Sequence, residues 1–245
     1  AIIGVWPLSG EIDDDFKTRI KAYMQKSDRE ARQETNWLSP CETYEKEIAS
    51  FIDHILSNPD FVKLASELSA KLAPAGVVNS LAIQALKILS PGVPDIYQGT
   101  ESFDFSLVDP DNRRAVDYKL REQLLDVRNE DWKSGAVKIG LTQKLLDIRR
   151  EHILGLKTPL QIVPLETTGQ FSDNLITYAL TDADRKTGLL VILPRFPGKM
   201  DIKENLSFDI DAAIRLPDFI EKAKLRDALT DQDMSSLDVK ALLAA

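Results

Sequence analysis

Cysteine, histidine and aromatic residues are scarce in this sequence, and their scarcity excludes several kinds of site. The chain has one cysteine and two histidines, and aromatic residues make up 7% of it. The single cysteine, Cys41, excludes an internal disulfide and any zinc site built from several cysteines. His54 and His152 each stand alone on a stretch with helical spacing, and no HExxH, GxSxG or Walker A pattern occurs. We therefore expect neither histidine to be catalytic, and we expect Cys41 not to be a nucleophile because it has no histidine partner.

An excess of basic residues and a long apolar run are also missing. The chain carries 31 Lys+Arg against 39 Asp+Glu, so its net charge is −8, which argues against a general nucleic-acid binder. No run approaches the roughly 18 apolar residues of a membrane span, and the first residues, AIIGVWPLSGE, lack the features of a signal peptide. With 245 residues, 43% of them hydrophobic, the sequence predicts a soluble, cytoplasmic, globular protein of one large or two small domains.

Helical spacing of apolar residues dominates the first part of the chain. We expect a helix that begins after an N-cap at Ser39 and has an apolar face ending at Ile55. Pro74 is expected to separate two further helices, because proline usually ends a helix. The other helical segments are 12–26, 28–36, 61–72, 77–90, 116–127 and 138–152.

After residue 155 the pattern changes to the period of two that is typical of strands. Strands are expected at 160–166, 174–182 and 187–195, with a further short one at Leu225–Leu229, whereas 239–245 is ambiguous. We therefore predict a helix-rich domain over 1–155 and a β-rich domain over 156–245.

A candidate site lies within the helix-rich part, in SPGVPDIYQGTE (90–101) and the irregular polar loop 103–118. A short buried strand that ends at Gly99 would deliver Tyr97, Gln98 and Glu101 to the C-terminal edge of a parallel sheet, where barrel enzymes bind substrates. The loop adds carboxylate, amide and guanidinium groups, which suit sugar hydroxyls. These loop residues are Asp109, Asp111, Asn112, Arg113 and Arg114.

The same loop also fits a purely structural turn. In that interpretation Asp109 and Asp111 form salt bridges with Arg113 and Arg114 and bind no substrate. In either case we expect Arg113 or Arg114 to be partly buried and to bridge one of the two aspartates, because an arginine fork can lock a loop.

Several segments carry a family resemblance. PGVPDIYQGTE resembles the eighth-strand segment of the α-amylase superfamily, in which G-x-P-x-I-Y-x-G-x-E is common. The longer run through DPDNRRAVDY is more similar to the maltooligosyltrehalose synthases, as are GVWPLSG, KAYMQKSDREARQETNW with SPCETYE behind it, and LAPAGVVNSLAIQALKILS. The resemblance covers residues 1 to about 155 well and the remainder weakly. Ala115 stands where this family usually has proline, so the turn is expected to be less rigid.

The resemblance implies an α/β plus β fold. It implies the end of a (β/α)8 barrel, with strand eight near Asp95–Gln98, an added helical region, and a β-rich C-terminal domain. It also implies an intramolecular transglucosylase that converts the reducing-end α-1,4 linkage of maltodextrins to an α,α-1,1 linkage, with no metal and no organic cofactor. The implied partners are the maltodextrin substrate and the remainder of the catalytic barrel, with no nucleic acid and no membrane.

No residues of this sequence correspond to the catalytic carboxylates of the family. Its third catalytic aspartate normally stands in a His-Asp pair, whereas the only neighbouring pair in this chain is Asp53-His54, in reversed order. The resemblance therefore implies a C-terminal portion without catalytic residues, in which Tyr97, Gln98, Glu101, Asp109, Asn112, Arg113 and Arg114 at most shape the substrate side.

Two other functions remain open on the sequence: a non-catalytic α-glucan-binding or assembly module, and a helical interaction protein with a β tail. Sugar-binding modules stack sugar rings on exposed aromatic side chains. Trp6, Trp37 and Trp132 lie far apart in the sequence, and we expect them to be packing residues.

Overall fold

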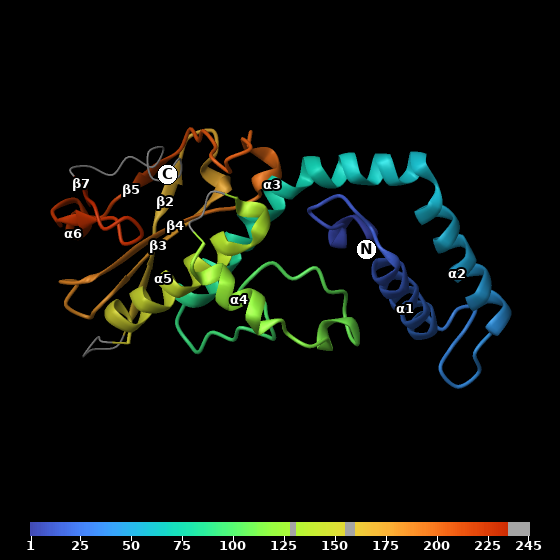
Figure 1. Ribbon diagram of the computed structural model, residues 1–245. Helices are drawn as coiled ribbons and strands as arrows, with labels where there is room; N and C mark the ends of the chain where they lie inside the picture. The colour runs from blue at the N-terminus through green and yellow to red at the C-terminus, as the bar shows by residue number, and fades with distance from the viewer. Residues whose placement is uncertain (128–130, 155–159, 235–245) are drawn as a thin grey trace. The chain divides into compact units, whose positions relative to one another are not determined.

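The computed structural model describes residues 1–127, 131–154 and 160–234. The chain forms two compact units (Figure 1). Unit 1 consists of Ala1–Ala73 and Gln98–Tyr118, and unit 2 of Pro74–Tyr97 and Lys119–Ala245. The first division between the units falls inside the long helix α3 (Pro59–Leu89), at Pro74.

In unit 1 a short 3-10 helix, η1 (Ile2–Val5), precedes α1 (Asp14–Ala31). Asp13 caps α1, because its carboxylate accepts a hydrogen bond of 2.8 Å from the backbone N–H of Phe16. The helix predicted over 12–26 is thus confirmed, and it continues to Ala31. Helix α1 lies beside α2 (Glu42–Ser57) (Figure 1).

The start of α2 differs from the prediction. Its N-cap residue is Cys41, whose side chain makes no capping hydrogen bond, so the expected N-cap at Ser39 is wrong. The turn before the helix is organised by other side chains. The backbone N–H groups of Leu38 and Ser39 donate to Asn36 Oδ1, and that of Cys41 donates to Thr35 Oγ1.

Helix α3 is continuous, so the predicted break near Pro74 is also wrong. Proline removes one backbone donor from the helix interior, but packing on both sides of it holds the helical path. Ala65 is buried in the core of unit 1, and Val77 and Val78 are buried in unit 2. By length and composition α3 is apolar enough to cross a membrane, a weak indication because core helices pass the same test.

The core of unit 1 forms where η1, α1 and α2 meet the first part of α3. Trp6 is 1% exposed and meets Phe16 edge to face, with 5.5 Å between the ring centroids. The expectation that Trp6 is a packing residue is therefore confirmed. The other buried members are Val5, Ile20, Ile52, Leu56, Ala65 and Leu107.

Unit 2 combines helices with open antiparallel sheets. Its helices are the end of α3, α4 (Tyr118–Leu125, whose first residue belongs to unit 1), α5 (Ala136–His152) and the short α6 (Asp218–Glu221). The main sheet has the order β1-β3-β4, formed by β1 (Gln161–Pro164), β3 (Leu175–Thr181) and β4 (Gly188–Pro194). Two smaller pairs join β2 (Glu166–Thr168) to β5 (Ala213–Arg215) and β6 (Leu225–Arg226) to β7 (Asp233–Met234).

These elements confirm the strands predicted at 160–166, 174–182 and 187–195 and the short one that begins at Leu225. The helices expected over 116–127 and 138–152 are present as α4 and α5. The ambiguous segment 239–245 lies outside the described residues.

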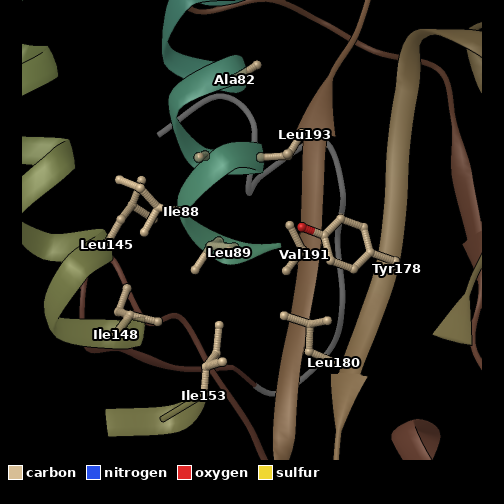
Figure 2. Close-up of a cluster of buried hydrophobic side chains, with 11 residues drawn as sticks. Ala82, Ile88, Leu89, Leu145, Ile148, Ile153, Tyr178, Leu180, Val191 and Leu193 are labelled. Carbon is tan, nitrogen blue, oxygen red and sulfur yellow. The ribbon is translucent and has the colours of Figure 1, made fainter. Parts of the chain in front are cut away.

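One apolar core in unit 2 joins helices to the main sheet. Figure 2 shows side chains of α3 between those of α5 and those of β3 and β4. Ile88 is fully buried there, and Leu180 is 1% exposed. Helix α5 ends at His152 and β1 begins at Gln161, and the domain boundary near residue 155 stays a prediction. The compact units nevertheless divide elsewhere, because this core uses elements from both sides of that boundary.

The predicted barrel strand near Asp95–Gln98 is not formed, and within the described residues every strand pairing is antiparallel. Residues 93–97 have no regular structure, because Pro91 and Pro94 lack backbone donors and no described strand lies alongside to pair with them. The structure thus shows helices with open sheets, and the end of a (β/α)8 barrel is not confirmed.

A buried arginine fixes the segment that follows α3. The guanidinium group of Arg149, on α5, donates to the carbonyl oxygens of Ile88, Ser90 and Gly92, and Arg149 is 6% exposed. Arg149 makes no salt bridge within the described residues. The carbonyl groups at the C-terminal end of α3, which carry partial negative charge, stabilise its positive charge instead.

We expect Arg149→Lys to lower the free energy of unfolding by about 1–3 kcal/mol, because an ammonium group cannot reach all these carbonyls and leaves some of them unpaired. Thermal and urea unfolding followed by circular dichroism measure this loss. Arg150→Lys is the matched control, since the side chain of Arg150 is 77% exposed and pairs with Asp147 at the surface. Equal losses in the two variants would contradict the role given to Arg149.

Candidate functional site

A largely buried ion pair holds the loop 103–118 of unit 1 against α1. Arg19 donates from Nε and Nη2 to the carboxylate of Asp111, at 2.9 Å for the shortest contact of each nitrogen. Arg19 Nη2 also donates to the carbonyl oxygen of Phe105 at 2.6 Å, and the backbone N–H of Leu107 donates to Asp111 Oδ2 at 2.6 Å. The side chains of Arg19 and Asp111 are 15% and 8% exposed. The ion pair therefore holds Phe105 and Leu107 of the loop near Asp111 and attaches the loop to α1.

The ion pair is charged at neutral pH. Burial alone raises the pKa of the Asp111 carboxyl, but the hydrogen bonds from Arg19 and Leu107 and the charges of Arg19 and Arg114 outweigh it, so the pKa lies below its ordinary value. The hydrogen bond with Asp111 raises the pKa of Arg19. Since all these donors converge on one carboxylate, Asp111 serves as the anchor of the loop.

The two arginines of the loop make the predicted pairs but are not buried. Arg113 Nε pairs with Asp109 Oδ1, and Arg114 Nε lies 3.1 Å from Asp111 Oδ1. Their side chains are 69% and 49% exposed, so the expectation of partial burial is wrong. The reason is Arg19, which occupies the buried side of the Asp111 carboxylate. The spacing within the loop could not reveal Arg19, because it lies on another element far away in the sequence.

Asp109 is held from α1 as well, whereas within the described residues Asn112 is not. Lys26 Nζ donates to the carbonyl oxygen of Asp109 at 2.6 Å. Asn112 lies in the short 3-10 helix η2 (Asp111–Arg113), and its Oδ1 is buried without a hydrogen-bond partner in the described part of the chain. Because this atom lies below the surface, Asn112 does not present it to solvent in this conformation.

The structure does not bring all the predicted site residues into one unit. Tyr97 is 45% exposed and belongs to unit 2, whereas Gln98, which is exposed, and Glu101, which is half-buried, belong to unit 1 with the loop. Gly99 between them has a φ of +91°, a conformation that favours glycine, so a side chain at this position would strain the turn. Within the described residues, no group of three or more potential metal ligands is found.

A second ionic cluster, centred on Glu45, was not predicted as part of a site. Arg29 of α1 donates to both oxygens of the Glu45 carboxylate at 2.7 Å. Thr35 Oγ1 donates to it at 2.7 Å and Gln25 Nε2 at 2.9 Å. The hydrogen bonds from Arg29 and Thr35 lower the pKa of Glu45 from 4.5 to about 2. The only sequence signal was its place in SPCETYE, one of the segments that carry the family resemblance.

The Glu45 cluster supports an exposed tryptophan. Trp37 is 55% exposed, so the expectation that it is a packing residue is wrong. The guanidinium carbon of Arg29 lies over its ring, 5.0 Å from the ring centroid. Trp132, by contrast, is half-buried and donates from Nε1 to the carbonyl oxygen of Glu204 at 2.8 Å.

Comparisons with known proteins agree on one relationship. No protein-family model matches the sequence. The chain is 39% identical to a Mycobacterium tuberculosis H37Rv protein with the provisional name maltooligosyl trehalose synthase. The match extends over 154 residues, which are 62% of this chain and 19%, about a fifth, of that protein. A solved maltooligosyltrehalose synthase from Arthrobacter ramosus superposes with a TM-score of 0.75 and 31% identity, over 95% of this chain and 28% of that one.

A Sulfolobus tokodaii structure, named a hypothetical maltooligosyl trehalose synthase, superposes with a TM-score of 0.69 and 29% identity, over 95% of this chain and 29% of that one. These findings confirm the resemblance to the maltooligosyltrehalose synthases. In each case this chain corresponds to less than a third of the relative.

The first prediction from this geometry separates Arg19 from Arg113. Arg19→Lys should lower the free energy of unfolding by about 1–3 kcal/mol, because lysine cannot reproduce the fork that holds Asp111 and Phe105. Arg113→Lys should change it by less than about 0.5 kcal/mol, because this exposed pair is screened by water. Urea unfolding of the two variants checks the contrast, and a larger loss in Arg113→Lys would refute it.

The second prediction concerns the pH dependence of the Glu45 cluster. Folding lowers the pKa of Glu45, so its contribution to stability is complete above the ordinary pKa of 4.5 and is lost as the pH falls toward about 2. Glu45→Gln should therefore lower the Tm at pH 7, and the difference from the unmodified chain should shrink below about pH 4. Glu42→Gln on the same helix is the control, since the side chain of Glu42 is 80% exposed. A difference in Tm that does not change with pH would contradict the assignment.

Proposed function

We propose that this chain is the C-terminal portion of an intramolecular transglucosylase that acts on maltodextrins. The reaction converts the reducing-end α-1,4 linkage to an α,α-1,1 linkage and leaves a terminal trehalose unit, which is (1→4)-α-D-glucan 1-α-D-glucosylmutase activity. The observation that supports this most is the similarity to maltooligosyltrehalose synthases over 95% of the chain at a TM-score of 0.75. Because the chain spans only about a fifth of its curated relatives, the activity of the whole protein is part of the proposal.

The chemistry of the whole enzyme would be a double displacement. One carboxylate attacks the anomeric carbon and forms a glycosyl-enzyme, while a second carboxyl protonates the departing oxygen. The released glucose re-binds, and its anomeric hydroxyl, in place of water, attacks the glycosyl-enzyme, giving its proton to the second carboxyl and displacing the first carboxylate. Such a pair of carboxyls stands about 5 Å apart in retaining enzymes. The sequence offers no residue onto which either role can be transferred from the family. We therefore propose that the catalytic pair lies in the rest of the parent enzyme and that this chain alone is inactive.

The proposed contribution of this chain is to shape the substrate side. Arg113 and Arg114 are exposed, and guanidinium groups can make paired hydrogen bonds with sugar hydroxyls. Arg19 and Asp111 hold the loop that carries them and keep its backbone in one conformation. Tyr97 is exposed enough to stack on a sugar ring. Gln98, Glu101, Asp109 and Asn112 complete the proposed substrate-binding set.

The partners that follow from this proposal are a maltodextrin and the remainder of the catalytic barrel, in the cytoplasm and without a metal or organic cofactor. A non-catalytic α-glucan-binding module is the second candidate function. The exposed ring of Trp37 favours it, because sugar-binding surfaces use aromatic side chains of this kind.

The test is incubation of the purified 245-residue chain with maltopentaose beside the full-length enzyme. We expect trehalose-terminated product from the full-length enzyme alone, because loss of the nucleophile and the acid/base removes most of the rate enhancement. Chromatography of the oligosaccharides measures the product. Product formed by the chain itself would refute its inactivity, and a full-length enzyme that forms none would refute the proposed reaction.

A further inference from the structure

Trp37 lies at the tip of a turn that is rigid on both sides. Asn36 Oδ1 accepts hydrogen bonds from the backbone N–H groups of Leu38 and Ser39, at 3.0 and 2.8 Å. Thr35, which is 2% exposed, accepts from the N–H of Cys41 at 3.0 Å and donates to Glu45 at 2.7 Å. These bonds fix the backbone on either side of the tryptophan, so its position is set before any ligand arrives.

The ring of Trp37 is supported as firmly as its backbone. Arg29 lies over the ring at 5.0 Å, and both oxygens of Glu45 hold the Arg29 guanidinium group at 2.7 Å. Despite this support the tryptophan remains 55% exposed. A large aromatic side chain that is held in one place and left open to solvent loses little conformational entropy on binding. This arrangement suits a platform for a flat apolar surface.

A hollow with both polar and apolar lining residues meets the support of this platform at Glu45. It lies between α1 and α2, has a volume of about 320 Å³, and shares Glu45 with the support of Trp37. The carboxylate of Asp28 makes no hydrogen bond within the part of the chain that the structure describes, whereas Gln25 donates to Glu45 and Lys21 pairs with Asp53, each at 2.9 Å. The polar lining consists of Thr18, Lys21, Gln25, Asp28 and Glu45.

We propose that Trp37 and this hollow form an α-glucan-binding site on unit 1, separate from the loop 103–118. One glucose ring stacks its apolar face on the indole, and the hydroxyl groups of the next ring bond with Asp28, Gln25 and Lys21 in the hollow. The choice of an α-glucan rests on the proposed function. The combination of an aromatic platform with carboxylate, amide and ammonium groups is independent of it and is the chemistry that sugars require.

A protein surface is the competing occupant, because Leu38 beside Trp37 is 98% exposed. Protein interfaces bury tryptophan together with neighbouring apolar side chains, and charged groups are depleted at their centre. The lining of the hollow contains Lys21, Asp28 and Glu45, so the adjoining surface is charged. Lys21 and Glu45 already have partners, but the carboxylate of Asp28 can bond with a sugar hydroxyl, whereas an apolar protein patch would bury it without a partner.

Titration of the 245-residue chain with maltoheptaose, followed by calorimetry and tryptophan fluorescence, tests the site. Trp37→Ala should weaken binding at least tenfold, Trp37→Phe should retain part of the affinity, and Asp28→Ala should weaken binding at least threefold. Leu38→Ala is the matched control and should stay within twofold of the unmodified chain. The Tm of each variant should remain unchanged within a few degrees, because the side chains of Trp37 and Leu38 are exposed.

The outcomes separate this site from the proposed function. No binding by a folded, unmodified chain, or equal losses in Trp37→Ala and Leu38→Ala, would overturn the inference. So would self-association that both variants abolish, since a second copy of the chain would then cover Trp37. If Trp37→Ala leaves glucan binding intact while the full-length enzyme makes trehalose-terminated product, this inference is wrong and the proposed function stands. If Trp37 binds glucan but the full-length enzyme makes no trehalose-terminated product, the proposed reaction is wrong and this inference stands.

Discussion

Guanidinium groups on helices hold the irregular segments of this chain in place. Such segments cannot satisfy their own backbone groups, and a forked donor can bond with several acceptors at once. Arg149 does this for the carbonyl groups that follow α3, and Arg19 does it for the loop around Asp111. Arg29 supports the turn before α2 through Glu45. Without these contacts the helices and sheets would remain, but the segments that carry the candidate sites would lose their fixed conformation.

The three arginines differ in how their charge is stabilised, and the difference has consequences for function. Arg19 and Arg29 face carboxylates, so the loops they hold depend on the ionisation of Asp111 and Glu45. Arg149 faces carbonyl groups at the end of a helix, and that contact depends on no carboxylate in the described residues. The charged loop and the turn that carries Trp37 are therefore segments of unit 1 whose local structure should respond to acid.

The two candidate sites of unit 1 combine rigidity with exposure in different ways. In the loop 103–118, Asp111 is buried and the groups that remain exposed are Arg113 and Arg114. Around Trp37, Glu45 is the buried anchor and the exposed group is an aromatic ring. A charged site and a stacking site together provide both kinds of contact that a glucan offers, hydroxyl groups at its edge and apolar ring faces.

Elements whose signal is local could be predicted from the spacing of residues alone. Helices α1 and α5 and strands β1, β3 and β4 follow from the spacing of apolar residues, and the family resemblance followed from short contiguous segments. Features that depend on partners far away in the sequence could not be predicted in this way. Packing on both sides carries α3 through Pro74, Asp95–Gln98 forms no strand because no described strand lies beside it, and Arg19 reaches Asp111 from another element. The exposure of Trp37 also depends on distant parts of the chain. Whether an apolar side chain is buried depends on what the fold places against it, and the spacing of residues in one segment carries no information about that.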